Sequence, residues 1–320
     1  MSQYKIARVV DQFGWAYHFI AKEHAKYSKH QIIPVKYDSV DVENYDLIYI
    51  HSPNICTYQI DRIVKNCQER GVKLIGAYAG DPAYWDNSVK KTYDHVDLAV
   101  GISPETYRFC LENYPGKTVF LPESIDDEFF VKTIDRGKWN FVVGWAGGLH
   151  KKVKRSHLLN KIKFPVRRQA DWKVDEFVES RTQDHMVNFY NEIDVLVLTS
   201  ITECQPRVVL EAMSCGKSVV ATDVGNIRML LDEKWIVPKY PEDLMASEMN
   251  RKLEILHNEK VEFLESAQRN REYVSKYFSW KANVQYWDLV FECVIHGDIE
   301  SAIKISNMFL DNNNLRKFLG

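Results

Sequence analysis

Long apolar runs, paired cysteines and an excess of charge of either sign are all missing from this sequence of 320 residues. No stretch approaches the roughly 18 consecutive apolar residues that a membrane span needs. Charged side chains enter the N-terminal segment before any apolar run develops, which argues against a signal peptide. The six cysteines form no CxxC pair, so disulfide-rich folds and zinc ribbons are excluded. With a formal charge of −2, these features predict a cytoplasmic protein that is not a polycation.

What the sequence does contain is the composition of an ordinary globular protein, with 45% hydrophobic and 27% charged residues. Short apolar runs alternate with amphipathic stretches of helical length, which is typical of parallel sheets covered by helices on both faces. Strands are predicted at residues 5–10, 31–35, 46–50, 73–78, 97–102, 118–121, 140–144, 163–168, 194–199, 218–222 and 235–237. Helices are predicted at residues 15–28, 57–70, 104–113, 184–191, 206–215 and 225–231, and throughout the region after residue 241.

This alternation occurs twice, with a linker near residues 127–138, and the chain length also suggests about two domains. We predict a Rossmann-like, doubly wound domain over residues 1–135 and a second over residues 136–280. C-terminal helices over residues 281–320 are expected to pack back on the first domain. Two facing sheets of this kind would leave an inter-domain cleft at the carboxyl ends of their strands, where ligands usually bind.

Residues 194–230 carry the most informative motif, which reads DVLVLTSITECQPRVVLEAMSCGKSVVATDVGNIRML. A buried strand runs into a loop, and Pro206 stands where the first residue of a helix is expected, because the missing N–H costs nothing there. Gly216 stands just past the end of that helix, a position that favours glycine. Two carboxylates, Glu203 and Glu211, lie eight positions apart across the loop and the helix.

Carboxylates beside a helix N-terminus suit a ligand that carries hydroxyl groups on both sides of a diphosphate. The first N–H groups and the dipole of the helix favour the phosphates, and the carboxylates accept hydrogen bonds from sugar hydroxyls. Glu203 or Glu211 alone is more simply a helix cap or a solvated surface residue. The whole strand, loop, helix, strand and glycine context favours the functional interpretation.

The same segment resembles the E-x7-E segment of the family-4 (group 1) retaining glycosyltransferases. The resemblance extends upstream to MVNFYNEIDVLVLTS and downstream to YVSKYFSW. It implies that Glu203 contacts hydroxyls of the donor sugar and that Glu211 contacts the ribose of the nucleotide. It also implies that the backbone N–H groups of Arg207 and Val208 face the diphosphate. The chain departs from the family pattern at Cys204, Lys217, Arg228 and Met229.

A second motif, NFVVGWAGGLHKKVKR at residues 140–155, is similar to a strand, glycine loop and lysine element of the same family. Small residues such as Gly147 and Gly148 let a ligand approach the backbone, and a nearby lysine neutralises the donor phosphates. Lys154 matches the family's lysine best, and Lys152 is second. Any one of these lysines can instead be an ordinary exposed side chain.

Residues 150–173 contain nine Lys and Arg residues against one acid. Such a patch would also suit an anionic acceptor, such as a phospholipid headgroup, and peripheral contact with a membrane. Nucleic acid is disfavoured, because no recognition motif accompanies the charge. Recognition of the nucleotide base is predicted in the loop at residues 178–181, which contains Arg181.

The N-terminal half carries three candidates for the acceptor side. Gly14 follows the first predicted strand, where family members place a glycine loop. His51 lies in DLIYIHSPN, which resembles the family's DxxHxHxP stretch, although an ordinary loop histidine is the simpler interpretation. In GAYAGDPAYW, Gly80 and Asp81 replace a histidine that many members carry after the next strand.

The resemblance implies a GT-B architecture and a retaining transfer without metal or other cofactor. It implies a nucleotide-diphosphate sugar as donor, UDP- or GDP-linked, and an acceptor that the sequence does not identify. The sequence contains no DxD triplet and no Ser-His-Asp or Cys-His constellation. Two alternatives stay open: a nucleotide-sugar epimerase on the same architecture, and a degenerate member that binds a nucleotide sugar without turnover.

Overall fold

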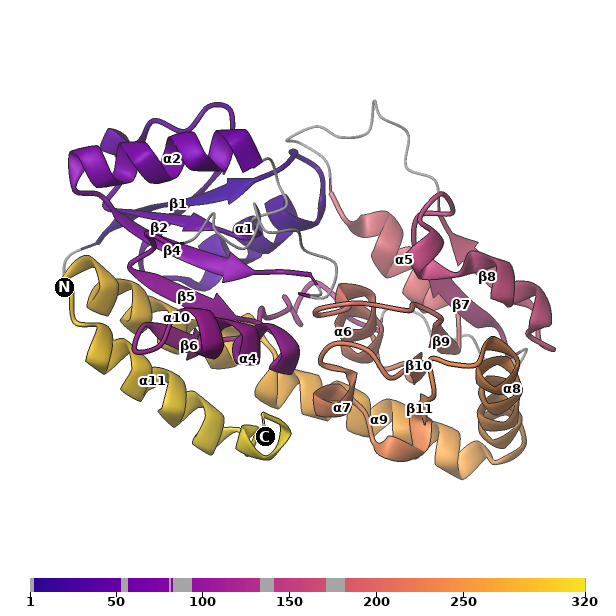
Figure 1. The fold of residues 1–320 in the computed structure, drawn as a ribbon. Coiled ribbons are helices and arrows are strands. Elements are labelled where there is room, and N and C mark those ends of the chain that lie inside the picture. Colours follow the sequence, from indigo (N-terminus) through magenta and orange to yellow (C-terminus); the bar gives the residue numbers. More distant parts are fainter. Residues whose placement is uncertain are drawn as a thin grey trace. The chain divides into compact units, whose positions relative to one another are not determined.

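The computed structural model describes residues 3–52, 57–80, 82, 94–132, 141–170 and 182–319. The chain divides into two compact units (Figure 1). Unit 1 is built from the described residues of Met1–Ser124 and Trp280–Gly320, and unit 2 from those between Ile125 and Ser279. The last helices of the chain therefore belong to the same unit as its first strand.

Unit 1 contains a six-stranded sheet in the order β2-β1-β3-β4-β5-β6, and all neighbouring strands run parallel. The strands are β1 (Lys5–Val10), β2 (Gln31–Lys36), β3 (Leu47–Ile50), β4 (Lys73–Tyr78), β5 (Leu98–Gly101) and β6 (Thr118–Phe120). Apart from the edge strand β2, these strands are buried along nearly their whole length. This burial explains why they appear in the sequence as continuous apolar runs.

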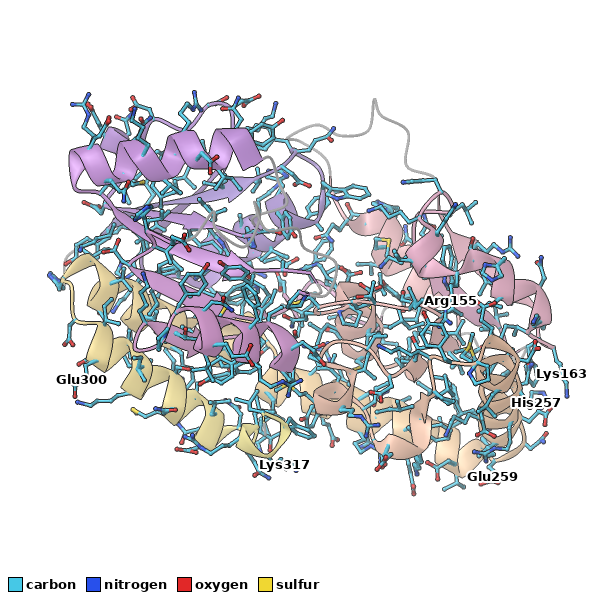
Figure 2. The ribbon with its side chains drawn as sticks, viewed as in Figure 1. Arg155, Lys163, His257, Glu259, Glu300 and Lys317 are labelled. Atoms are coloured by element: carbon cyan, nitrogen blue, oxygen red, sulfur yellow. The ribbon has the colours of Figure 1, made fainter. Side chains whose placement is uncertain are left out.

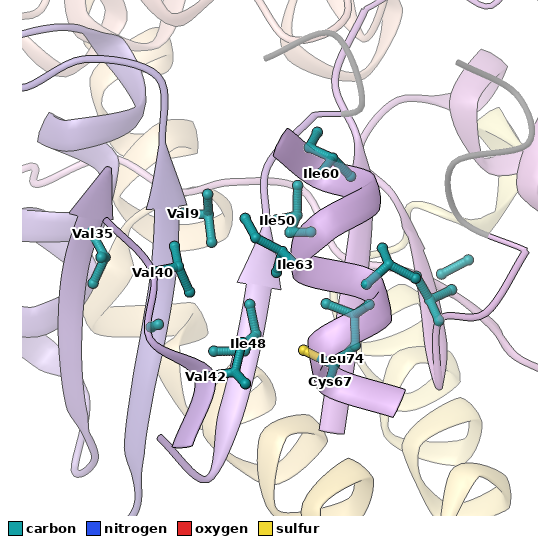
Figure 3. Close-up of a cluster of buried hydrophobic side chains, with 14 of the residues drawn as sticks. Val9, Val35, Val40, Val42, Ile48, Ile50, Ile60, Ile63, Cys67 and Leu74 are labelled. Atoms are coloured by element: carbon teal, nitrogen blue, oxygen red, sulfur yellow. The ribbon is translucent and has the colours of Figure 1, made fainter. Parts of the chain in front are cut away.

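One face of this sheet is covered by α2 (Thr57–Arg70), as Figure 3 shows. Ile60, Ile63 and Cys67 recur at a spacing of three and four residues, which places them on one side of the helix. They belong to the same buried cluster as Ile48 of β3. The helical spacing in the sequence therefore translates directly into the packing of this layer.

The opposite face is covered by the C-terminal helices α10 (Trp280–Ile295) and α11 (Ile299–Asn312) (Figure 1). Tyr49 of β3 faces this side, because side chains alternate along a strand, and its ring centroid lies 5.6 Å from that of Trp287. The Ser306 hydroxyl of α11 accepts a hydrogen bond from the N–H of Phe120 at 2.9 Å and donates one to its carbonyl at 3.1 Å. Among the described residues of the unit, the other α-helices are α1 (Ala16–Tyr27) and α4 (Pro104–Asn113).

Unit 2 contains a five-stranded parallel sheet in the order β11-β10-β9-β7-β8. The strands are β7 (Val143–Ala146), β8 (Val166–Gln169), β9 (Val195–Leu198), β10 (Ser218–Thr222) and β11 (Ile236–Val237). The helices are α5 (Asp184–Glu192), α6 (Arg207–Ser214), α7 (Ile227–Leu230), α8 (Glu242–Asn258) and α9 (Lys260–Tyr277). The predicted α/β class with two parallel sheets is confirmed. Because all strands run parallel, the loops after β7, β9 and β10 meet at one edge of the sheet.

The predicted strands at residues 5–10, 73–78 and 218–222 coincide with β1, β4 and β10. β7 begins at Val143 instead of residue 140, and β8 begins at Val166 instead of residue 163. Phe141 has a φ of 40°, and this left-handed conformation interrupts an extended strand.

The predicted linker, residues 127–138, is described up to Lys132. Its first part is held in unit 2 by Arg271, whose guanidinium donates to the carbonyls of Asp127 and Phe130 at 2.9 and 3.0 Å. Within the described ranges, none of the helices combines the length and the apolar character that crossing a bilayer requires.

Candidate functional site

Lys154 and Glu203 form an ion pair beyond the carboxyl ends of β7 and β9. Lys154 ends a short 3-10 helix after β7, and Glu203 lies in the loop between β9 and α6. The Lys154 Nζ lies 2.5 Å from Glu203 Oε1, and the Ser200 hydroxyl donates to the same oxygen at 2.7 Å. The lysine and glutamate side chains keep 22% and 13% of their exposure. The structure thus brings together two residues from separate sequence motifs.

Hydrogen bonds join the Lys154 segment to the end of β9. The Thr199 hydroxyl donates to the Lys154 carbonyl at 2.7 Å, and the Ile201 N–H donates to the Val153 carbonyl at 2.9 Å. These bonds tie two stretches that are far apart in the chain. The position of Lys154 relative to Glu203 therefore follows from the backbone at the sheet edge.

Arg155, which Figure 2 labels, also holds these loops together. Its guanidinium donates to the carbonyls of Thr199 and Lys239 at 2.7 Å each and to that of Ser200 at 3.2 Å. Arg155 is buried and has a φ of 48°, a left-handed conformation that costs on the order of 1–3 kcal/mol. Burial lowers the pKa of this guanidinium. Three hydrogen bonds from a charged group, at about 1.5–3 kcal/mol each, offset the backbone cost.

The loop after β10 contacts the Glu203 loop directly. The Asn226 N–H donates to the Cys204 carbonyl at 3.0 Å. Gly225 has a φ of 53°, and a Cβ atom added there would lie 2.1 Å from the Cys204 carbonyl oxygen. Only glycine allows this approach, so the two loops support each other.

Glu211 is buried on the second turn of α6, and both of its oxygens have partners. The Tyr190 hydroxyl donates to Oε2 at 2.6 Å, and the Arg207 Nε lies 3.0 Å from Oε1. Burial raises the pKa of the Glu211 carboxyl, while Arg207 and Tyr190 act in the opposite direction. The same pair raises the pKa of Tyr190 well above its usual value, through burial and the nearby carboxylate.

Helix α6 begins one residue later than predicted, because Pro206 is extended, with a ψ of 97°, and forms the N-cap. Arg207 and Val208 start the helix, so their N–H groups belong to the first turn, which an α-helix leaves without intrahelical partners. At the other end, the Gly216 N–H donates to the Met213 carbonyl at 2.9 Å. Gly216 has a φ of 64°, which confirms the glycine stop read from the sequence.

Gly147 and Gly148 lie directly after β7. The Gly147 N–H donates to the Gln169 carbonyl at 3.0 Å, and a Cβ atom there would lie 3.0 Å from the Trp145 ring. The Lys152 side chain is exposed, and its ammonium group forms no hydrogen bond or ion pair with the residues that the structure describes. The Lys152 ammonium therefore faces solvent, whereas that of Lys154 is paired with Glu203.

Three of the nine basic residues at positions 150–173 pair closely with acids from α5 and α8. Lys161 pairs with Asp243 at 2.6 Å, and Lys163 pairs with Glu254 at 2.9 Å. Arg167 pairs with Glu192. Lys163 lies at the outer side of unit 2 (Figure 2). This pairing weakens the case for a broad anion-binding surface.

In unit 1, His51 follows β3 and is 1% exposed. Its Nδ1 lies 3.4 Å from Glu123 Oε1, and its ring stacks on Tyr17 at a centroid distance of 4.7 Å. Glu123 also pairs with the buried Arg8 at 2.5 Å and accepts from the Tyr49 hydroxyl at 3.1 Å. His51 therefore lies beside a buried ion pair, a more specific environment than that of an ordinary loop histidine.

Gly14 has a φ of 73°, and its N–H donates to His18 Nδ1 at 2.9 Å. Burial lowers the pKa of His18 to about 4, with a smaller contribution from Lys22. The neutral ring can therefore keep accepting this hydrogen bond near neutral pH. Two further predicted residues, Asp81 and Arg181, lie outside the described residues.

Three residues that shape the site are not predicted by the sequence patterns: Tyr190, Ser200 and Arg155. Tyr190 lies in the MVNFYNEIDVLVLTS segment that precedes the Glu203 loop, and Ser200 lies three positions before Glu203. Both positions were visible, but only the folded chain shows which hydroxyl reaches which carboxylate. No pattern in the sequence marks the left-handed backbone of Arg155. Within the described part of the chain, no group of three His, Cys, Asp or Glu residues is arranged to hold a metal ion.

Residues 141–255, roughly a third of the chain, match the model of the family described as glycosyl transferases group 1. No curated protein matches the chain. The solved structure of Anabaena Alr3699/HepE in complex with UDP and glucose is 15% identical, with a TM-score of 0.68 over 95% of this chain and 100% of that one. Sucrose-phosphate synthase from Thermosynechococcus elongatus is 14% identical, with a TM-score of 0.68 over 92% and 100%.

The lipopolysaccharide outer core galactosyltransferase WaaB, in its apo form, is 13% identical, with a TM-score of 0.61 over 91% of this chain and 99% of that one. At such low identity these structures show the fold, which is the predicted GT-B architecture. Over residues 141–255 the family match confirms the resemblance to group 1 glycosyltransferases. The chain carries a glycosyltransferase domain.

Replacing Gly225 by alanine tests how the two loops support each other. We expect Gly225→Ala to lower the free energy of unfolding by more than about 2 kcal/mol, because its Cβ meets backbone atoms as well as a left-handed φ. Gly216→Ala is the matched control, since it shares the positive φ but has nothing within 4 Å, and it should cost about 1 kcal/mol. Equal losses in urea denaturation would show that the loop contact is unimportant.

Proposed function

We propose that this chain, whose residues 141–255 form a glycosyltransferase group 1 domain, transfers a sugar from a nucleotide-diphosphate sugar to an acceptor. The observation that carries the proposal is the contact between Lys154 and Glu203 beside the first turn of α6. A cation for phosphates, a carboxylate for hydroxyls and the start of a helix lie at one edge of the sheet. A nucleotide sugar is the ligand class that needs all three.

Donor binding exchanges the partners of the Lys154 and Glu203 pair. In the structure the two side chains neutralise each other, and both keep some exposure. A diphosphate offers Lys154 two negative charges, and sugar hydroxyls offer Glu203 hydrogen-bond donors. The ion pair therefore keeps both side chains oriented toward the site before the donor binds.

The diphosphate would lie against Lys154 and the first turn of α6, where the helix dipole favours negative charge. Lys152 is exposed nearby and is the second cation for this ligand. Solved structures that resemble this chain contain UDP or UDP-glucose, which supports a uridine nucleotide as the first donor to test. Positive charge supplied by the chain itself supports a transfer that needs no metal.

Glu211 would hold the ribose. Tyr190 and Arg207 occupy one position on each carboxylate oxygen, which leaves lone pairs for ribose hydroxyls. Its burial makes such a hydrogen bond strong, because the surroundings of the carboxylate are poorly hydrated. Gly14 and His51 of unit 1 remain the proposed acceptor-side residues.

We propose that the anomeric configuration is retained. The bond from the anomeric carbon to the phosphate oxygen breaks as the acceptor oxygen attacks from the same face. The departing phosphate oxygen takes the acceptor proton, and the nucleoside diphosphate leaves. Lys154 and the α6 N–H groups stabilise the negative charge that develops on this leaving group.

Lys154 and Glu203 should have separable roles. We expect Lys154→Ala to weaken binding of UDP-glucose about ten- to a hundredfold, because a hydrogen bond to a charged phosphate is lost. Glu203→Gln should leave UDP binding unchanged or tighter, since Lys154 loses its competing anion, and should reduce transfer about a hundredfold. Calorimetry and a transfer assay measure the two effects.

Lys163→Ala is the control for the loss of a lysine, because Lys163 pairs with Glu254 on the surface. It should change neither binding nor transfer. Equal losses of binding and transfer in both site variants would contradict the division of roles. Release of free nucleotide without an acceptor would instead point to an epimerase or to hydrolysis.

Glu211 should make donor binding depend on pH. Because burial raises the pKa of this carboxyl, acidification should weaken UDP-glucose binding at a pH above the usual glutamate value of 4.5. Glu211→Gln should bind more weakly and lose this step. Tyr190→Phe should move the step to higher pH, because the hydroxyl bond that lowers the pKa of Glu211 is removed. Unlike UDP, whose terminal phosphate titrates near pH 6, UDP-glucose adds no step of its own in this range.

A titration of UDP-glucose affinity between pH 4.5 and 7.5 for these three proteins gives the measurement. The same step in wild type and Glu211→Gln would show that another group titrates, and that Glu211 is not the ribose ligand.

A further inference from the structure

Asn226 is fully buried, yet neither polar atom of its carboxamide has a hydrogen-bond partner among the residues that the structure describes. It is the N-cap of the four-residue helix α7, but its side chain does not cap that helix. Burying a polar group without a partner is costly, and native proteins leave few such groups. An asparagine that gives the fold no side-chain hydrogen bond needs another reason to be there.

The other four buried asparagines that the structure describes all use their carboxamides, which makes the contrast informative. Asn250, for example, accepts from the Lys163 N–H at 2.9 Å and donates to the carbonyls of Lys161 and Ala246. Amide donors are likewise engaged in Asn191, Asn270 and Asn283. Asn226 is therefore an exception among the described residues of its type.

Asn226 lies beside the Glu203 loop. Its backbone N–H donates to the Cys204 carbonyl at 3.0 Å, and the preceding Gly225 approaches the carbonyl oxygens of Glu203 and Cys204. It follows β10, which pairs directly with β9, the strand that leads to Glu203. The backbone of Asn226 therefore lies against the loop that carries Glu203, the residue proposed to hold the donor sugar.

We propose that the Asn226 carboxamide binds hydroxyl groups of the donor sugar, an inference that rests on the proposed function. A carboxamide both donates and accepts hydrogen bonds, as a sugar hydroxyl does. A phosphate only accepts, so it would leave the Asn226 oxygen without a partner. The side chain thereby selects the sugar, while Lys154 and the start of α6 hold the diphosphate.

The carboxamide is shielded from water in the structure, so the sugar reaches it only when neighbouring atoms move. The Glu203–Cys204 segment is in direct contact with Gly225 and Asn226 and is the part that must shift. Opening of the Lys154 and Glu203 pair on donor binding frees this segment. Sugar recognition by Glu203 and by Asn226 is therefore coupled.

The test compares a nucleotide with its sugar conjugates. Wild type is first titrated with UDP, GDP and their glucose, galactose, N-acetylglucosamine and mannose conjugates. For the conjugate that binds, Asn226→Ala should lower affinity about ten- to a hundredfold, while the parent nucleotide should bind within about twofold of wild type. The melting temperature of unliganded Asn226→Ala should be unchanged or raised, because no hydrogen bond is lost.

Asn250→Ala is the matched control. It removes a buried carboxamide that has three hydrogen bonds, so its melting temperature should fall while its relative affinity for nucleotide and conjugate stays that of wild type. A fall in the melting temperature of Asn226→Ala like that of Asn250→Ala would assign Asn226 to the fold and overturn the proposal. Unchanged conjugate binding, or equal loss of nucleotide and conjugate, would also overturn it. If no conjugate binds wild type, the proposed function itself fails.

Discussion

The hydrogen bonds that join the Lys154 segment to the end of β9 are the constraint on which the candidate site depends. They connect residues more than forty positions apart in the chain through the Thr199 hydroxyl and the Arg155 guanidinium. Parallel strands bring their carboxyl ends to one edge, but that topology alone does not fix side chains to within an ångström. Arg155 supplies the missing precision, and its left-handed backbone is tolerated because three carbonyls fix its guanidinium.

In unit 1, too, a buried arginine joins segments that are far apart in the chain. Arg8 is fully buried in β1 and pairs with Glu123, which comes from the loop after β6. The guanidinium carbon lies 4.3 Å from the centroid of the Tyr49 ring, so part of its surface is covered by an aromatic face. Such a pair contributes little net stability, because desolvation cancels much of the attraction. Its clearest structural effect is to join β1 to the loop after β6, next to His51.

The sequence predicted the sheets well because parallel strands buried on both faces leave an unmistakable apolar pattern, as in β1, β4 and β10. The position of Glu203 and Glu211 around a predicted helix start made them candidates, and the resemblance to a glycosyltransferase family added Lys154. The sequence could not predict the contact between Lys154 and Glu203. That contact depends on a turn in which Arg155 has a left-handed backbone conformation, which arginine rarely adopts. Nor could the sequence show that acids from α5 and α8 pair with three residues of the basic segment, because those partners are distant in the chain.

The buried polar groups of unit 2 differ in what satisfies them, and this difference separates structural roles from functional ones. Arg155 and Asn250 have their hydrogen bonds within the protein, so removing either should damage the fold itself. Glu211 is satisfied in part and has lone pairs to spare for a ligand. The Asn226 carboxamide has no partner in the described part of the chain, so its burial costs stability. A chain keeps such a residue when a bound molecule supplies the missing hydrogen bonds, which makes the cost in stability itself an argument for a binding role.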